Sequence, residues 1–124
     1  MQEVSVIIPN FNGMAYLDGV LAGLECQSVN NFEVILVDNG SSDGSCAFVA
    51  ARYPWVHLIE LPENFGFCKA VNEGIKASRA PYVLLLNNDI EVTENFIEEM
   101  IFAIKRHPKA CLLYTSDAAD ELDG

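Results

Sequence analysis

The sequence predicts an α/β fold, a mostly parallel sheet with flanking helices. Short apolar runs, typical of strands buried on both faces, alternate along the chain with segments whose apolar residues recur at helical spacing. Strands that alternate with helices form βαβ units, which place neighbouring strands parallel. The chain has 124 residues and is 51% hydrophobic, enough for one domain with a buried core.

The first strand is predicted at residues 4–8, where an apolar run stops at Pro9. A helix is expected over residues 14–27, because apolar side chains recur there every three or four positions. Asn12 or Gly13 is placed to cap the start of this helix. The two elements therefore open a βαβ unit.

The second strand is predicted at residues 32–37, directly before Asp38. A polar turn follows it, and Ser42 or Asp43 in that turn can cap a second helix that runs to about Tyr53. The second strand and its helix thus repeat the order of the first pair.

The third strand, residues 56–61, is expected to be short. A loop at residues 64–67 leads into a helix over about residues 68–78. The fourth strand, residues 82–86, is a continuous apolar run after Pro81, typical of a strand buried on both faces.

The last predicted helix covers residues 95–105, with Thr93 as its cap and Pro108 as its stop. Residues 111–114 have the composition of a strand start, but the chain after them is small, acidic and aperiodic. We therefore expect one domain over residues 1–110 and a non-native or disordered tail over residues 111–124.

The charge balance limits the classes of partner. Seven basic and eighteen acidic residues give a formal net charge of −11, which argues against nucleic acid, because its phosphates need a basic surface. No apolar run approaches the ~20 residues that cross a bilayer, so no membrane segment is expected in this chain. The start lacks the features of a signal peptide, which predicts a cytoplasmic protein whose four cysteines are reduced and buried.

Polar residues follow three of the predicted strands. Asn10 follows the first strand, Asp38 follows the second, and Asn87, Asn88 and Asp89 follow the fourth. Open α/β sheets bind ligands beyond the carboxyl ends of their strands, so these side chains indicate one binding edge. Asp89 is the best single metal ligand of the chain, and one carboxylate with substrate phosphates suits Mg²⁺ or Mn²⁺.

The loop before the third helix adds features of an anion site. Gly66 permits close approach of the backbone just before a helix N-terminus, where phosphates commonly bind. Lys69 and Asn72 are three positions apart and share one face of that helix. Taken alone, this pattern also fits a solvated lysine beside a structural glycine.

Taken together, these stretches resemble the family 2 glycosyltransferases, which have the GT-A fold. The resemblance spans about residues 3–109, in the family's order. The matching stretches are residues 4–13, 27–28, 33–45, 64–75 and 84–92. The Asn-Phe-Gly-Phe and Asn-Asn-Asp motifs are most similar to those of the rhamnosyltransferase-type branch.

The resemblance implies a GT-A Rossmann-like, mostly parallel sheet, here truncated, with a nucleotide-sugar site at its carboxyl edge. Pro9, Asn10 and Asp38 would lie against the base and the ribose of the nucleotide. Lys69 and Asn72 would lie near the nucleotide or its diphosphate, next to the loop that contains Gly66.

Asn87, Asn88 and Asp89 stand where the family has its Asp-x-Asp motif, which implies Asp89 as the ligand of Mg²⁺ or Mn²⁺. The first acidic residue of that motif is an asparagine here, so one negative charge is missing from the expected site. Asn87 and Asn88 would then contact the donor through their amides.

The resemblance also implies an inverting transfer from a UDP- or dTDP-sugar to a glycan or lipid-linked acceptor, with a carboxylate as general base. That base is expected downstream of the chain end, so no residue is assigned as catalytic and this fragment is expected to be inactive. The full-length parent would work in cell-wall or polysaccharide synthesis at the inner face of the membrane.

Two other classes remain open on the residues alone. A non-catalytic, receiver-like module that binds a nucleotide or a metal also places acids at strand ends. It would need acids after the first strand, where Asn10 and Asn12 stand. A dinucleotide-binding enzyme would need a GxGxxG turn at the same place, and none is present.

Overall fold

The computed structural model describes residues 2–106 and 112–115. Within them the strands and helices alternate as predicted. The strands are β1 (Val4–Asn10), β2 (Phe32–Asp38), β3 (His57–Glu60), β4 (Tyr82–Leu86) and β5 (Leu112–Thr115). The helices are α1 (Met14–Glu25), α2 (Ser45–Arg52), α3 (Phe67–Ala77) and α4 (Phe96–Lys105).

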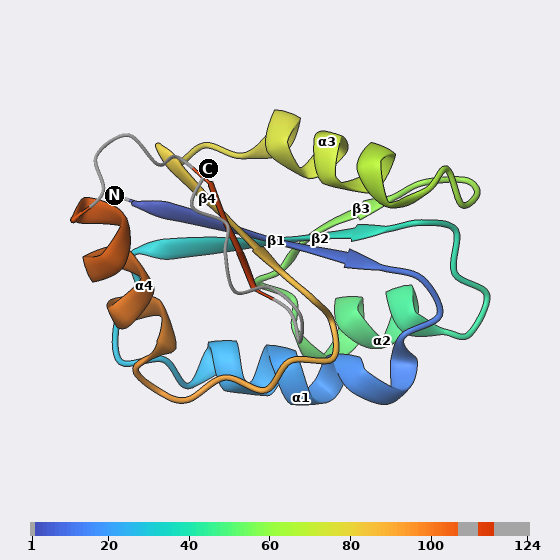
Figure 1. The fold of residues 1–124 in the computed structure, drawn as a ribbon. Coiled ribbons are helices and arrows are strands. Elements are labelled where there is room, and N and C mark those ends of the chain that lie inside the picture. The colour runs from blue at the N-terminus through green and yellow to red at the C-terminus, as the bar shows by residue number, and fades with distance from the viewer. Residues whose placement is uncertain (1, 107–111, 116–124) are drawn as a thin grey trace.

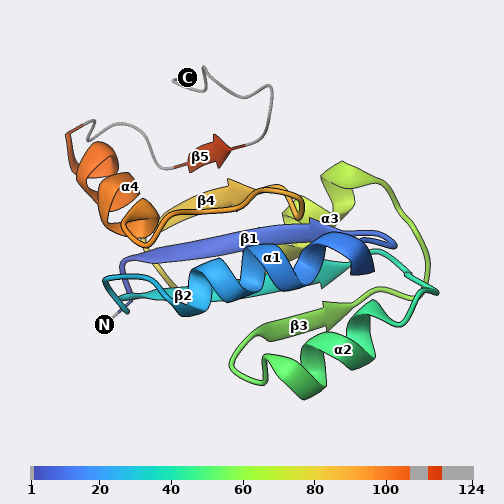
Figure 2. The ribbon, with the colours of Figure 1, turned by 90° about the horizontal axis from the view of Figure 1, so that it is seen from below.

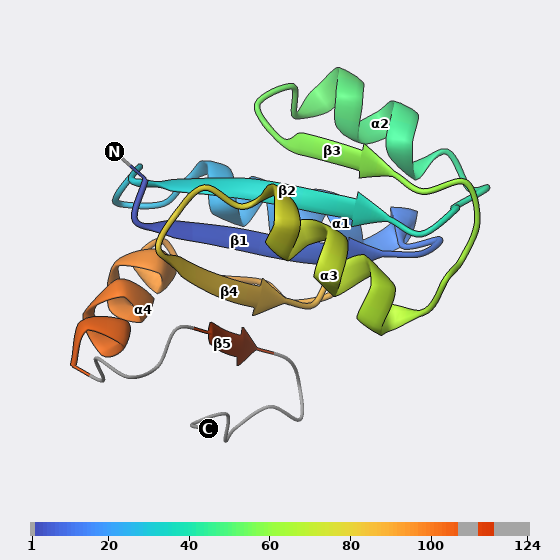
Figure 3. The ribbon, with the colours of Figure 1, turned by 90° about the horizontal axis from the view of Figure 1, so that it is seen from above.

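The five strands form one parallel sheet in the order β3-β2-β1-β4-β5. All the carboxyl ends therefore point to the same edge, as Figure 3 shows. The strand order reverses beside β1, because β2 and β3 lie on one side of it and β4 and β5 on the other. Such a switch point leaves a crevice outside the carboxyl ends, which is where ligands of open α/β sheets bind.

Helices cover both faces of the sheet unequally (Figures 1 and 2). One face packs against α1, α2 and α4 in the larger of two cores, with Leu17, Leu21 and Ile97 among its buried residues. The other face has a smaller core, in which Ile7 of β1 meets Ala70 of α3. At Gly74 an added Cβ would lie 2.5 Å from Ile7 Cγ2, so α3 sits close against the sheet because of that glycine.

The predicted elements agree with the structure, and their ends differ by a few residues. The largest difference concerns the cap of α4: the helix has Asn95 at its N-cap, not Thr93, and no side-chain cap bond there. Instead the Ile97 amide donates to Gln27 Oε1 at 2.8 Å. The cap prediction was wrong because the partner comes from the end of α1, far away in the sequence.

The expectation of buried cysteines is also wrong in part. Cys26 and Cys68 are exposed and Cys46 is half-buried, all three as free thiols. The fourth cysteine lies outside the described residues. In the segment expected to be a tail, Leu112–Thr115 pairs with β4 as a parallel strand, whereas residues 116–124 lie outside the described residues. The domain boundary after residue 110 stays a prediction.

In the described part of the chain, no helix combines the length and the apolar character needed to span a bilayer.

Candidate functional site

The carboxyl edge brings the predicted polar residues of three strands together. Asn10 at the end of β1 is the register partner of Asp38 at the end of β2. The loop after β4 places Asn88 beside Asn10. Both Asn10 and Asp38 are only 2% exposed, so their polar atoms must find partners within the protein.

Four polar side chains at this edge are joined by a chain of hydrogen bonds, which we call the amide relay. Its members are Asn88, Asn10, Asp38 and Ser41. Asn88 Nδ2 donates to Asn10 Oδ1 at 2.8 Å, and Asn10 Nδ2 donates to Asp38 Oδ1 at 2.9 Å. Ser41 donates its hydroxyl to Asp38 Oδ1 at 2.7 Å and its amide to Oδ2 at 2.8 Å. The relay thus joins the end of β4 to the loop after β2.

Gly13, the N-cap of α1, lies directly against this relay. An added Cβ there would fall far inside contact distance of Asn88 Nδ2 and of Asn10 Oδ1. The two amides can therefore meet only because residue 13 has no side chain.

The loop after β2 is tied to the starts of two helices. The Asp43 carboxylate accepts hydrogen bonds from the amide and hydroxyl of Ser45 at the start of α2, and from the Met14 amide at the start of α1 at 3.0 Å. The hydrogen bond from the Ser45 hydroxyl, with that from Met14, lowers the pKa of this carboxyl. Asp43 therefore helps to fix the loop that contains Ser41.

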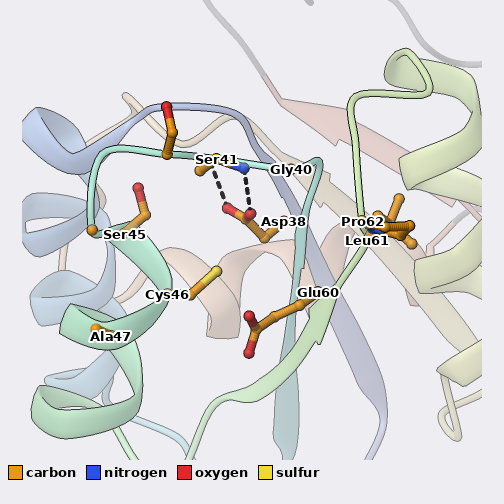
Figure 4. Close-up of a pocket in the computed structure, with 11 residues that line it drawn as sticks. Asp38, Gly40, Ser41, Ser45, Cys46, Ala47, Glu60, Leu61 and Pro62 are labelled. Atoms are coloured by element: carbon orange, nitrogen blue, oxygen red, sulfur yellow. Dashed lines mark hydrogen bonds between the residues drawn. The ribbon is translucent and has the colours of Figure 1, made fainter.

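A cavity of about 340 Å³ opens beside the relay (Figure 4). Its walls are the loop after β2, the first turn of α2 and the end of β3, so it offers the carboxylates of Asp38 and Glu60 and the hydroxyls of the intervening loop. The thiol of Cys46 also faces it, and burial, with the nearby Asp38 carboxylate, raises the pKa of that thiol to about 12. Cys46 thus lines the cavity as a protonated thiol and is not a nucleophile at neutral pH.

A second buried amide ties the loop after β2 to the loop before α3. Asn39 Nδ2 donates to the Gly66 carbonyl at 3.0 Å, and Asn39 Oδ1 accepts from the Phe65 amide at the same distance. Gly66 has φ 95°, in the left-handed region that favours glycine. An added Cβ at Gly66 would meet nothing within 4 Å, so the backbone there is open to approach.

The predicted cation of the site, Lys69, lies in the first turn of α3. Its Nζ is 3.1 Å from Glu73 Oε2, and Lys76 contacts the same carboxylate at 3.5 Å. Lys69 lowers the pKa of Glu73 through a hydrogen bond and its charge. Asn72 is exposed on α3. Neither Lys69 nor Asn72 touches the amide relay through any contact found among the described residues.

Asp89 is exposed in the loop after β4, one residue beyond the relay. Within residues 2–106 and 112–115, no three His, Cys, Asp or Glu side chains gather in a way that could hold a metal ion. The donor set therefore fits a hard divalent ion only if ligand oxygens complete its shell, as Mg²⁺ often requires. Asn87 is half-buried at the end of β4 and its carbonyl accepts from the Ile90 amide.

The loop that contains Asp89 runs back along α1. An added Cβ at Gly23 would lie 2.8 Å from Val92 Cγ2, so this helix is close to the loop. Gln27 joins this loop to α1, because its Nε2 donates to the carbonyls of Gly23 and Thr93 at 2.9 and 2.7 Å. The loop is therefore held at both ends, by Asn10 and by Gln27.

The structure thus places Pro9, Asn10, Asp38 and Asn88 together, with Gly66 linked through Asn39, and leaves Lys69, Asn72 and Asp89 exposed around them. Several other residues of the site belong to the motifs that the sequence analysis uses or lie beside them, but were not assigned as site residues. They are Asn12, Gly13, Asn39, Ser41, Cys46 and Glu60. For Asn12 the signal is its φ of 51°, unusual for a residue other than glycine, but such a value is visible only in the structure.

Comparisons with known proteins agree with this geometry. The model of the family described as glycosyl transferase family 2 matches residues 5–123. Glycosyltransferase GlyG of Streptococcus pneumoniae is 28% identical over 98% of this chain and 41% of its own length. An uncharacterized glycosyltransferase of Haemophilus influenzae is 31% identical over 86% of this chain and 44% of its own length. The chain thus spans less than half the length of these relatives.

Solved structures give the same result. Staphylococcus aureus TarS 1-349 aligns with a TM-score of 0.77 at 26% identity, over 86% of this chain and 33% of that one. TarS is also known in complex with UDP-GlcNAc. The mannosyltransferase PcManGT of Pyrobaculum calidifontis, in complex with GDP-Man and Mn²⁺, aligns with a TM-score of 0.67 at 26% identity, over 72% of this chain and 28% of that one. The parallel sheet, the polar carboxyl edge and the family match lead to one conclusion: this chain belongs to glycosyl transferase family 2 and has a GT-A-like fold.

Proposed function

We propose that this chain is the donor-binding part of an inverting glycosyltransferase that uses a UDP- or dTDP-sugar. One observation carries the proposal: the polar ends of β1, β2 and β4 are joined at the switch point of the sheet. The complexes of TarS with UDP and UDP-GlcNAc support it, because TarS has the same fold. Transfer by the whole protein, to a glycan or lipid-linked acceptor, is part of the same proposal.

The residues take different parts in this site. Asp38 and the open pocket beside it would receive the base and ribose, next to Pro9. The exposed backbone at Gly66 and the N-terminus of α3 face solvent, where a diphosphate would be stabilised by amide groups and by the helix dipole. Lys69 and Asn72 on α3 would complete this polar surface.

Asp89, with Asn87 and Asn88 before it, is the proposed binding segment for Mg²⁺ or Mn²⁺. When bound, the metal would neutralise the charge of the departing nucleoside diphosphate. Asp89 is exposed and close to the relay, so its part is to hold the ion at the carboxyl edge where the diphosphate would lie. The Mn²⁺ found with PcManGT supports this assignment.

The Asp89→Ala variant should lose metal-dependent nucleotide binding. Because Asp89 is the only acid of the Asn-Asn-Asp motif, its removal should weaken UDP binding in the presence of Mn²⁺ by roughly tenfold or more, the effect of losing one charged ligand. Calorimetry with UDP and dTDP, with and without Mn²⁺, measures this. The matched control is Glu91→Ala, an exposed acid of the same loop, which should bind as the wild type does. UDP binding that ignores both Asp89→Ala and removal of the metal would contradict the site assignment.

Lys69 and Glu73 should act on diphosphate binding in opposite directions. Lys69 is paired with Glu73, so Glu73→Gln would release the ammonium and should tighten UDP binding a few-fold, whereas Lys69→Ala should weaken it. Lys76→Ala is the control, since Lys76 contacts the same carboxylate from the far end of the helix. Equal effects of Lys69→Ala and Lys76→Ala on the UDP dissociation constant would show that Lys69 does not meet the diphosphate.

The rhamnosyltransferase-type assignment and the place of the parent at the inner face of the membrane are proposals as well. The first rests on the Asn-Phe-Gly-Phe and Asn-Asn-Asp motifs. A part of the parent in cell-wall or polysaccharide synthesis is supported by a relative named as a putative teichuronic acid biosynthesis glycosyltransferase. The receiver-like alternative is disfavoured, because Asn10 at the end of β1 forms amide hydrogen bonds where that class needs an acid.

A further inference from the structure

We propose that Asn10 is a positioning residue that couples the two ends of the donor site. One end is Asp38, the last residue of β2, with Ser41 in the loop that follows, and the other is the loop after β4, with Asn88 and Asp89. The inference rests on the proposed function, since it concerns how that site transmits binding. Asn10 itself is 2% exposed and both its amide atoms have protein partners, so its part is indirect.

The direction of every hydrogen bond in the relay follows from Asp38. An ionised carboxylate only accepts hydrogen bonds, so Asn10 must present its Nδ2 to Asp38. Its Oδ1 then faces Asn88, which in turn must donate through its own Nδ2. The orientation of the Asn88 amide, next to the proposed metal ligand Asp89, is thus set by a carboxylate on another strand.

No other arrangement of Asn10 satisfies both neighbours. A rotated amide would direct Oδ1 at the Asp38 carboxylate, acceptor against acceptor, and Nδ2 at Asn88, which could accept from it only by rotating its own amide. Sideways movement is limited too, because Gly13 lies against both Asn10 Oδ1 and Asn88 Nδ2. Asn10 therefore satisfies both loops in one orientation, the one in which its Nδ2 faces Asp38 and its Oδ1 faces Asn88.

A ligand that orders Asp38 should for this reason also order the loop that contains Asp89, and the reverse. Nucleotide and metal then tighten each other's binding through the protein, in addition to any direct contact between them. Reciprocal coupling of this kind between two sites commonly amounts to about 5- to 150-fold in affinity.

Asn39 offers a matched control. It is the same residue type, it is 5% exposed, and its side chain also forms two hydrogen bonds at the same edge. Those bonds join the loop after β2 to Phe65 and Gly66, not to the loop after β4. Asn39→Ala should therefore disturb the edge to a similar extent and leave the path through Asn10 intact.

The first experiment needs no ligand. Ser41→Ala removes the hydroxyl that donates to Asp38 Oδ1 and accepts from Asn10 Nδ2 and from the Asn12 amide. In the wild-type and Asn39→Ala backgrounds, ¹H–¹⁵N NMR should show this change as a shift of the Asn88 side-chain amide signal. In the Asn10→Ala background the Asn88 signal should no longer respond to Ser41→Ala. An Asn88 response that survives in Asn10→Ala, or that disappears in Asn39→Ala, would overturn the proposal.

The second experiment measures UDP binding with and without Mn²⁺ in the complete chain. The ratio of the two dissociation constants should fall several-fold towards one in Asn10→Ala and keep its wild-type value in Asn39→Ala. Asn10→Asp, which keeps the size of the side chain but not its donor, should lose coupling as Asn10→Ala does. An unchanged ratio in Asn10→Ala would refute the coupling, whereas wild-type protein that binds no UDP would refute the proposed function and leave the NMR result to decide the coupling.

Discussion

Replacement of Asp38 by alanine should destabilise the protein and abolish its affinity for nucleotide. Asp38 is 2% exposed and accepts three hydrogen bonds, one from Asn10 and two from Ser41. Its loss leaves buried donors without their acceptor, at about 1–3 kcal/mol for each unsatisfied group. Since Ser41 can turn its hydroxyl elsewhere, we expect a total loss of about 3 kcal/mol in the free energy of unfolding.

The Asp38→Asn variant separates charge from shape. Asparagine fills the same space and keeps one acceptor oxygen, which can still accept from Asn10 Nδ2 and the Ser41 hydroxyl in place of Oδ1. Its amide nitrogen then replaces Oδ2 and faces the Ser41 amide, donor against donor. We expect a smaller loss of stability, about 1 kcal/mol, together with a clear loss of UDP affinity. Chemical denaturation and calorimetry with UDP measure the two quantities. An Asp38→Ala protein as stable as the wild type would show that the relay contributes nothing to the fold.

The location of polar residues at the carboxyl edge of the sheet can be predicted from the sequence, but their hydrogen-bond partners cannot. The strand at residues 82–86 was predicted with its observed bounds, because a continuous apolar run between a proline and polar residues admits few other structures. Parallel strands then bring their carboxyl ends to one edge whatever their order. The positions of Asn10, Asp38 and Asn88 follow from that rule alone.

Which amide faces which depends on the register between strands that are far apart in the chain. In the sheet, Val4 pairs with Phe32 of β2 and with Tyr82 of β4, and the periodicity of the sequence does not predict this register. The need for glycine at position 13 depends on the same register, because the register places the Asn88 side chain against it. The cap of α4 failed as a prediction for the same reason, because Gln27 reaches it across about seventy residues.

Substitution of Gly13 by alanine should be strongly destabilising, although alanine normally favours helices. The backbone at Gly13 has φ −101°, which alanine adopts without strain, so the effect isolates the contact. The added Cβ would overlap Asn88 Nδ2 and Asn10 Oδ1, and overpacking at a well-packed site costs about 1–3 kcal/mol. We expect a loss of about 2 kcal/mol, to which the poorer cap quality of alanine makes a lesser contribution.

Gly19→Ala is the matched control on the same helix. Its Cβ would lie 3.9 Å from the nearest atom, in Glu91, and alanine within a helix is better than glycine by about 0.5–1 kcal/mol, so this variant should be more stable than the wild type. A double-mutant cycle then tests the cause at Gly13. If the overlap with Asn88 contributes to the loss in Gly13→Ala, part of that loss should disappear when Asn88→Ala is the background, while the overlap with Asn10 Oδ1 remains. Additive losses in both the Asn88→Ala and the Asn10→Ala backgrounds would instead assign the effect to the helix cap and remove Gly13 from the site.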